Sequence, residues 1–233
     1  MDLIQTVQEL RDAFSAARDG VAKRHPTWDV VRDARLTGFS KAINVLNSTQ
    51  LGLVHIRFHL TDRGWWNTIS RTPIPEADLT IYVAEFDMFV KLGFLQFLFA
   101  SLESSLRAFL RAIDPSACTG GTAEFKSVYD CLFTRLGLTL YTPLLDLLRL
   151  IRNTVHNNGV YFHRSGAAET VTHSGTAYTF SVGRRVSFVT WPFLFGLAPE
   201  VRHLLLDTVE SAAICAPSFI QDPFAPEPER PQA

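Results

Sequence analysis

Apolar residues recur every three or four positions along most of the chain. Such stretches cover about residues 2–23, 29–47, 76–113, 124–136 and 142–157. This spacing places the apolar side chains on one side of an α-helix, where they can pack against other helices. The hydrophobic pattern therefore predicts a mainly α protein built from several amphipathic helices.

Two segments between these predicted helices are less regular. Residues 54–60 alternate apolar and polar side chains, as a strand would, but they could also continue the preceding helix past Gly52. We favour the helix, because no partner strand is visible nearby. Residues 63–75 contain two tryptophans and two prolines and are predicted to form a loop. A further linker is expected at Cys118–Thr122.

The composition changes after Gly159 toward β-branched and aromatic residues. Residues Tyr178–Val182 and Val186–Thr190 are predicted to form a small β-hairpin that turns at Gly183. A closing helix is expected from about Pro199 to Ala213. The chain is thus expected to end with a short β segment and one last helix.

These elements predict a single domain over residues 1–221. Its helical core is expected at about 76–214, with an N-terminal helical extension before it and the hairpin as an insertion at about 177–191. The proline-rich end, 222–233, is predicted to be disordered. We find no internal repeat and no linker long enough to require two domains.

Composition and charge narrow the possible functions. With 233 residues, of which 47% are hydrophobic and 19% charged, the chain can bury a sizeable core. The formal net charge of −1 argues against a uniformly basic nucleic-acid binder, so any anion site must be local. The three cysteines lack zinc or redox spacing and no signal peptide is evident, which indicates reduced thiols in a cytoplasmic protein.

The most apolar part of the longest predicted helix is Ile81–Ala100. It carries Glu85, Asp87 and Lys91, which would be costly in lipid, so we expect a buried helix and no membrane span. Its apolar residues cover more than one face, and one neighbouring helix rarely buries that much surface. We therefore expect the central helix of a bundle or a dimer face, and we predict a homodimer.

One polar stripe on the predicted helix 142–157 combines residues suited to phosphate chemistry. Arg149 lies seven residues before His156, and Arg152 lies four before it, so the three side chains share one side of the helix. Histidine can transfer a proton near neutral pH, and arginine can stabilise charge on a phosphate. The combination suits metal-independent phosphodiester cleavage. The same residues also fit an ordinary helix end, where cations interact favourably with the helix dipole.

The segment Leu148–Gly159 resembles the signature helix of the HEPN superfamily, whose members are helical bundles and include many dimeric ribonucleases. The family motif joins an arginine, often followed by a polar residue, to a histidine a few residues later. Arg149 leaves six residues before His156, which is within the family spacing. Arg152 is followed by the polar Asn153 but leaves only three residues before the histidine. Both assignments of the motif arginine stay open.

The resemblance implies a role for each polar residue of this segment. His156 would act as general acid or base on the 2′-hydroxyl or the leaving oxygen. Arg149 or Arg152 would stabilise the phosphate in the transition state. Asn153 and Asn157 would bind or orient the substrate. None of these roles requires a metal ion.

Residues Phe97–Arg107 resemble another core helix of the family, and Glu103 on it is a candidate to hold a motif arginine in place. In the family the signature helices of two protomers meet, so the site is composite. The resemblance therefore implies a HEPN-like helical bundle that cleaves RNA as a homodimer, in a bacterial defence or toxin system with an antitoxin or another protein partner. The alternative is a non-catalytic helical dimer that binds a partner protein or a nucleotide.

Other candidate sites are weaker. The pair His55 and His59 and the pair Glu200 and His203 have spacings that occur in metal sites, but neither has further ligands nearby in the sequence. The chain contains no P-loop and no Gly-x-Gly-x-x-Gly motif. We therefore predict neither a metal nor a cofactor.

Overall fold

The computed structural model describes residues 2–117 and 124–225, and the linker expected at residues 118–122 lies outside these ranges. The protein is mainly helical, with one small antiparallel sheet. The elements follow in chain order as α1 (Leu3–Arg24), α2 (Ala34–His55), a π-helical turn (Ile56–Leu60), α3 (Arg63–Ile69), α4 (Glu76–Ile113), α5 (Phe125–Leu136), a 3-10 turn (Thr139–Tyr141), α6 (Thr142–Val155), β1 (Glu169–His173), β2 (Thr176–Phe180), α7 (Trp191–Val209) and α8 (Ala212–Cys215).

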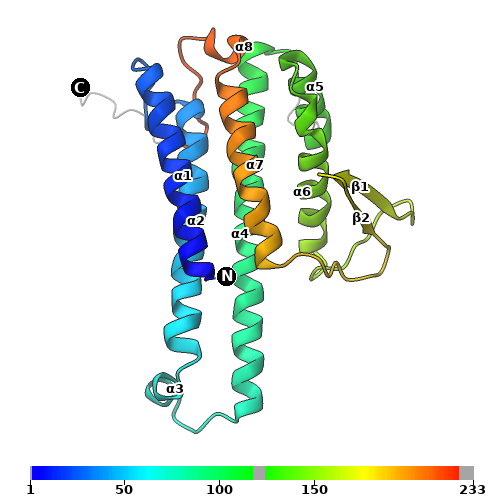
Figure 1. Ribbon diagram of the computed structural model, residues 1–233. Helices are drawn as coiled ribbons and strands as arrows, with labels where there is room; N and C mark the ends of the chain where they lie inside the picture. Colours follow the sequence, from blue (N-terminus) through cyan, green and yellow to red (C-terminus); the bar gives the residue numbers. More distant parts are fainter. Residues whose placement is uncertain (1, 118–123, 226–233) are drawn as a thin grey trace, which may run out of the picture.

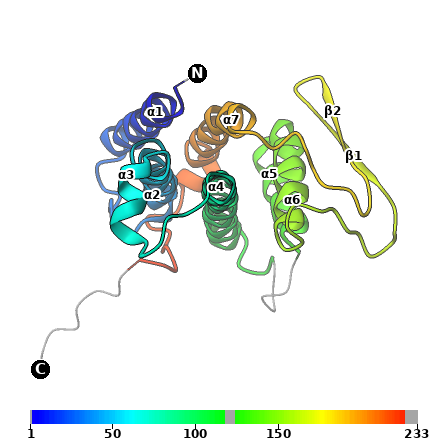
Figure 2. The same ribbon diagram turned by 90° about the horizontal axis from the view of Figure 1, so that it is seen from below.

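The long helices α1, α2, α4 and α7 lie side by side as a bundle (Figures 1 and 2). Helices α5 and α6 pack on the other side of α4, and the β1–β2 hairpin lies outside α6 (Figure 2). Helix α4 lies at the centre of the arrangement, as one of the two expectations for Ile81–Ala100 has it (Figure 2). Only its second half is buried, however, so the expected burial is wrong for residues 81–93. Within the described residues, no helix has the length and apolar character needed to cross a bilayer.

The two halves of α4 differ in burial. Beyond residue 93 its apolar side chains form the centre of the core, including Leu98, Leu102 and Phe109. From residue 80 to residue 93 none of its side chains is buried. This first half extends away from the bundle together with the end of α2 and with α3 (Figure 1). We call residues 51–92 the projecting hairpin.

The projecting hairpin differs in part from the expectations. Residues 54–60 continue the helix, as favoured, and end in the π-helical turn. Residues 63–69 form α3, so the predicted loop is wrong there and holds only from Ser70 onward. The Asp62 side chain caps α3 by accepting from the backbone N–H of Gly64, at 2.9 Å. The Trp66 indole donates to the carbonyl of Leu60 at 2.9 Å, which fixes the short helix against the turn before it.

The β-hairpin lies earlier in the chain than predicted. Its strands pair Glu169 with Phe180 and His173 with Thr176, and the chain turns at Ser174 and Gly175. Both turn residues have positive φ, 49° and 77°, as a tight hairpin turn requires. The predicted turn at Gly183 exists, but the residues after it do not form a strand and contribute only an isolated bridge between Val160 and Arg185.

The last long helix begins well before the predicted Pro199. Helix α7 starts at Trp191, where the Thr190 side chain accepts from the backbone of Phe193 and a proline occupies the first turn. The Trp191 indole is buried and donates to the Asp87 carboxylate at 2.7 Å, which fixes the start of α7 against α4. Pro199 lies inside the helix, where its missing N–H removes one backbone hydrogen bond.

The ordered fold also extends slightly past the predicted boundary at residue 221. Asp222 is buried and accepts from the Lys41 ammonium at 2.7 Å, and its backbone N–H donates to the carbonyl of Arg32. The C-terminal segment therefore packs across the start of α2. The rest of the predicted tail, from residue 226, lies outside the described residues.

Candidate functional site

Helix α6 carries the polar stripe that the sequence singles out. Its start is favoured by Pro143 in the first turn, and its apolar side chains, such as Leu144, Leu148 and Ile151, are buried. On the outer side, Asp146, Arg149, Arg152 and His156 follow one another at a spacing of three or four, and Asn153 lies beside Arg152. The stripe becomes more exposed toward the end of the helix, since Arg149 and Arg152 are half-buried and His156 is exposed.

Arg149 is enclosed by groups from three elements. One guanidinium nitrogen lies 3.5 Å from the Asp146 carboxylate and 3.9 Å from the Glu169 carboxylate of β1. The Asp146 carboxylate also accepts from the Tyr129 hydroxyl of α5 and from the Lys126 ammonium at 3.0 Å. Arg149 thus joins α5, α6 and the β-hairpin through a network in which its charge is balanced by two carboxylates.

The surroundings of Tyr129 and Arg149 raise the pKa of both side chains. Burial, followed by the neighbouring Asp146 carboxylate, raises the pKa of Tyr129 well above its usual value. Burial acts against the charged form of Arg149, but contacts with Tyr129, Asp146 and Glu169 outweigh it and raise its pKa. Near pH 7 Tyr129 is therefore protonated and Arg149 is charged, and the two carboxylates balance the arginine.

Arg152 has a different environment one turn further along α6. Its guanidinium lies over the Phe99 ring of α4, 5.7 Å from the centroid, and donates to the Asn153 side chain at 3.4 Å. No carboxylate within the described ranges lies at ion-pair distance from it. The ring contact leaves the charge of the guanidinium without a carboxylate partner among the described residues, so the charge is available to an anion.

His156 caps the C-terminal end of α6. Its backbone keeps nearly helical dihedral angles, φ −63° and ψ −16°, so its side chain continues the stripe one turn beyond Arg152. The chain then leaves the helix through Asn158 and Gly159, which both have positive φ. Asn157 is exposed beside His156. The imidazole is therefore accessible to a ligand that also reaches Arg152.

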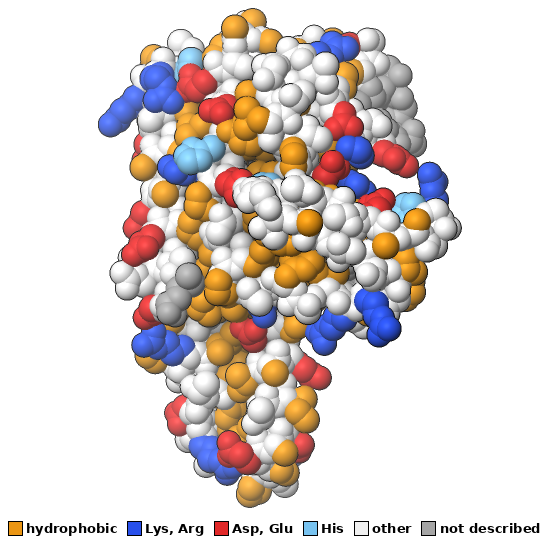
Figure 3. Space-filling model, turned by 45° about the vertical axis from the view of Figure 1, so that its right-hand side comes forward, with side chains coloured by type: hydrophobic (Ala, Val, Ile, Leu, Met, Phe, Trp, Pro, Cys, Tyr) orange, Lys and Arg blue, Asp and Glu red, His pale blue; other side chains and the backbone are white. Residues whose placement is uncertain are grey.

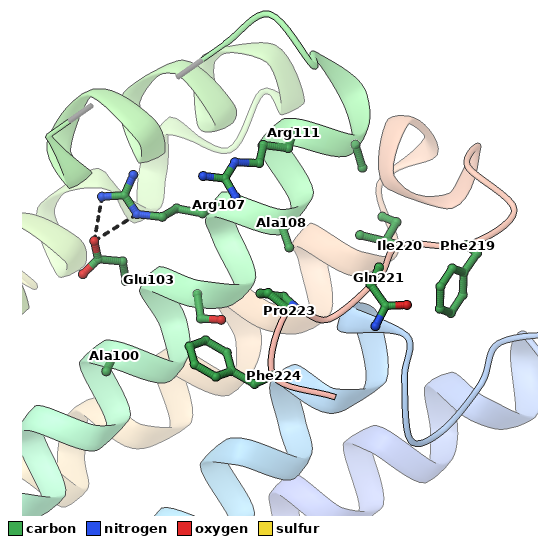
Figure 4. Close-up of a pocket in the computed structure, with 12 residues that line it drawn as sticks. Ala100, Glu103, Arg107, Ala108, Arg111, Phe219, Ile220, Gln221, Pro223 and Phe224 are labelled. Carbon is green, nitrogen blue, oxygen red and sulfur yellow. Dashed lines mark hydrogen bonds and ion pairs between the residues drawn. The ribbon is translucent and has the colours of Figure 1, made fainter. Parts of the chain in front are cut away.

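Glu103 pairs with a residue of its own helix. Its carboxylate accepts from Arg107 on the same helix at 2.6 Å, and neither residue is paired with an arginine of α6. Both line a cavity of about 580 Å³ between α4 and the C-terminal segment, beside Arg111 and Phe224 (Figure 4). Within this chain Glu103 thus binds an arginine of its own helix, and its role toward a motif arginine stays a prediction.

The end of α6 lies next to the root of the projecting hairpin. Ile151, Asn158 and Gly159 line a small cavity together with Met88 and Leu92 of α4. Hydrophobic side chains run down the projecting hairpin below this point, and charged side chains surround the β-hairpin above it (Figure 3). The C-terminal end of α6 therefore lies beside Met88 and Leu92 of the projecting hairpin.

Sequence analysis missed the groups that enclose Arg149. Asp146, three residues before Arg149, has the spacing of a helical ion pair and could have been found. Tyr129 and Glu169 come from other elements, and nothing in the local sequence signals their approach. Comparison with protein-family models, with curated proteins and with solved structures found no match for this chain.

Proposed function

We propose that the protein is a HEPN-like, metal-independent endoribonuclease whose site is formed by Arg152 and His156. One observation carries the proposal: an exposed imidazole lies one helical turn from a guanidinium that no described carboxylate neutralises. Arg149, by contrast, is held by two carboxylates. We therefore assign phosphate binding to Arg152 and give Arg149 the structural task of fixing α6 against α5 and the β-hairpin.

The proposed reaction uses the 2′-hydroxyl of RNA as the nucleophile. The His156 imidazole accepts the hydroxyl proton while the 2′-oxygen bonds to phosphorus and the bond to the 5′-oxygen breaks. Arg152 stabilises the charge that grows on the phosphate oxygens, and Asn153 and Asn157 orient the backbone. The leaving 5′-oxygen takes up a proton, so the products are a 2′,3′-cyclic phosphate and a free 5′-hydroxyl.

The second proton transfer supports a composite site. A proton acceptor and a proton donor are needed in the same step, and the stripe on each chain carries one histidine. Two copies that meet at the ends of their α6 helices would supply two imidazoles. The neighbouring apolar surface of the projecting hairpin provides the contact area for such a homodimer, with Phe89 71% exposed and Ile81 52% exposed.

The proposal is tested by RNA cleavage with purified protein. We expect His156→Ala to abolish cleavage of labelled single-stranded RNA and of transfer RNA, while its thermal unfolding stays close to that of wild type. Arg152→Ala should reduce the rate by about 100-fold, as the loss of a transition-state contact does. Arg149→Ala should lower the melting temperature more than Arg152→Ala. Wild-type activity should survive EDTA.

The matched control is His203→Ala, which removes another exposed histidine from α7. It should cleave RNA at the wild-type rate. A wild-type protein that leaves every RNA intact, freed of any bound antitoxin, would contradict the proposal. So would a His156→Ala protein that cleaves as fast as wild type.

A second candidate function rests on the projecting hairpin alone. Its exposed apolar residues also suit a non-catalytic helical dimer that binds a partner protein or a nucleotide. The two candidates differ in one result. The binding protein would remain a dimer and leave RNA intact, and His156→Ala would not change its assembly.

A further inference from the structure

Three residues with metal-binding side chains meet at the end of the bundle opposite the projecting hairpin. His25 follows α1, Glu210 follows α7 and Cys215 lies in α8, and Figure 1 shows these ends close together. One ligand atom from each residue lies within 4.8 Å of the others. His25 is 185 residues before Glu210 in the chain, so its approach to Glu210 and Cys215 is a product of the fold.

The His25 imidazole is held in a fixed orientation. It stacks on the Trp28 ring with centroids 3.8 Å apart and an interplanar angle of 4°. Its Nε2 atom lies 3.1 Å from Glu210 Oε2. The Trp28 ring is itself packed against the guanidinium of the buried Arg35, 3.7 Å from the centroid. A ligand whose ring plane is set by packing loses little freedom when it binds an ion.

The local field at this end favours a cation. Helices α1 and α7 both direct their C-terminal ends toward the cluster, and the free carbonyls of a helix end carry partial negative charge. The Cys215 thiol donates to one of these carbonyls, that of Val209, at 3.2 Å. Arg24 binds Glu210 through Oε1 at 2.6 Å, which leaves Oε2 directed toward His25.

From this arrangement we propose that His25, Glu210 and Cys215 bind a zinc ion. An imidazole nitrogen, a carboxylate oxygen and a thiolate sulfur are the ligands zinc prefers. Ligand atoms around a tetrahedral zinc lie about 3–4 Å apart, so small rotations of these side chains complete the site. The thiol proton is released to solvent on binding, and the thiolate and carboxylate then balance the charge of the ion. Solvent takes the fourth position, since Glu210 is exposed.

The ion would join the two ends of the chain. His25 belongs to the N-terminal helix, whereas Glu210 and Cys215 follow the last long helix. A ligand that binds only the folded state raises its stability, so zinc would stabilise the contact between α1 and the α7–α8 turn. Helix α6 ends toward the projecting hairpin, away from this cluster (Figure 1). The inference is therefore independent of the proposed ribonuclease site.

The experiment uses the full-length protein, stripped of metal with EDTA and dialysed. Titration with zinc chloride against a chromophoric zinc indicator should show one site per chain, and saturating zinc should raise the melting temperature by about 5 °C. Cobalt in place of zinc should give a thiolate-to-metal charge-transfer band. Cys215→Ser should remove that band, and Cys215→Ser and His25→Gln should each weaken zinc binding at least tenfold.

Cys131→Ser is the matched control, because it removes a half-buried thiol on α5 that lies outside the cluster. It should bind zinc and form the cobalt band as wild type does. If wild-type protein shows no saturable binding, the proposal is overturned. It is also overturned if Cys215→Ser keeps wild-type affinity, which would assign the binding to other histidines. Circular dichroism of each variant verifies that weaker binding does not come from unfolding.

Discussion

The two ends of the bundle differ in what covers their side chains. At one end the start of α2 is closed by α8 and the C-terminal segment, and even the guanidinium of Arg35 is fully buried. We call this the closed end. At the other end the projecting hairpin leaves Phe58, Phe89 and Ile81 more than half exposed. At the closed end, buried polar groups form hydrogen bonds with other protein groups. On the projecting hairpin, apolar side chains are exposed to solvent.

Arg35 shows how the closed end tolerates a buried charge. Its guanidinium donates to both carboxylate oxygens of Asp33 and to the carbonyls of Ile214, Pro217 and Ser218. All five N–H groups of an arginine can be used in such an arrangement, so burial leaves few of them without an acceptor. The projecting hairpin contains no comparable network within the described residues. Its exposed apolar surface is the one that the proposed homodimer would bury, whereas the buried arginine of the closed end finds its acceptors within one chain.

The largest expected effect comes from removing the charge at the closed end. Arg35→Ala would leave the Asp33 carboxylate buried without its ion pair and three carbonyls without a donor. We expect the free energy of unfolding to fall by about 3–5 kcal/mol, as for other broken buried ion pairs. Urea denaturation followed by circular dichroism measures this loss.

The control for Arg35 is Arg32→Ala, a short distance earlier in the chain. Arg32 pairs with Asp29 near the surface, with 40% and 29% of the two side chains exposed. Its loss should change the free energy of unfolding by about 1 kcal/mol or less. Equal losses for the two variants would mean that burial does not distinguish the closed end.

The next effect tests the exposed end. Wild-type protein should be a dimer at micromolar concentration, and Phe89→Asp should weaken self-association at least tenfold because a carboxylate would enter the apolar contact. Sedimentation velocity over a concentration series measures both. Leu140→Asp is the control, since Leu140 is 68% exposed on the turn before α6 and outside the projecting hairpin. A wild-type monomer would refute the composite site.

The smallest effect is a pH dependence at the closed end. Burial opposes the ionisation of Asp222, but the hydrogen bonds that its carboxylate accepts, with the one from Lys41 the strongest, together outweigh burial and hold the pKa of this carboxyl below its usual 3.8. The ionised pair therefore stabilises the folded state above about pH 4, and this contribution is lost as pH falls through the lowered pKa.

Asp222→Asn should accordingly cost about 1 kcal/mol at pH 7 and progressively less below pH 4. Urea denaturation at pH 7, 5 and 3 measures the difference from wild type. A difference that stays constant with pH would contradict the assignment to the ionised pair.

The helices that position the site could be predicted because their signals are local. The bounds of α4 follow from its apolar spacing between Pro75 and Asp114, and α6 from the proline in its first turn. Helix α7 has the same kind of start signal at Thr190 and Pro192, whereas the sequence analysis places the start of this helix at Pro199. A proline inside a helix and one at its start cannot be distinguished without knowing what Trp191 packs against.

The hairpin and the Arg149 network could not be predicted for a different reason. Gly175 and Gly183 both have positive φ, and only the pairing of Glu169 with Phe180 decides which turn carries the hairpin. That same pairing brings Glu169 to Arg149. The sequence identified the stripe on α6, but it could not show which of its arginines is balanced by carboxylates from other elements.

The buried position of Arg35 also has a consequence for the order of events during protein synthesis. Its three carbonyl acceptors follow it by 179, 182 and 183 residues. While the ribosome is still making the preceding helices, these acceptors do not yet exist, and Arg35 and Asp33 have only water and each other as partners. The start of α2 therefore cannot reach its final packing before Ser218 has been added.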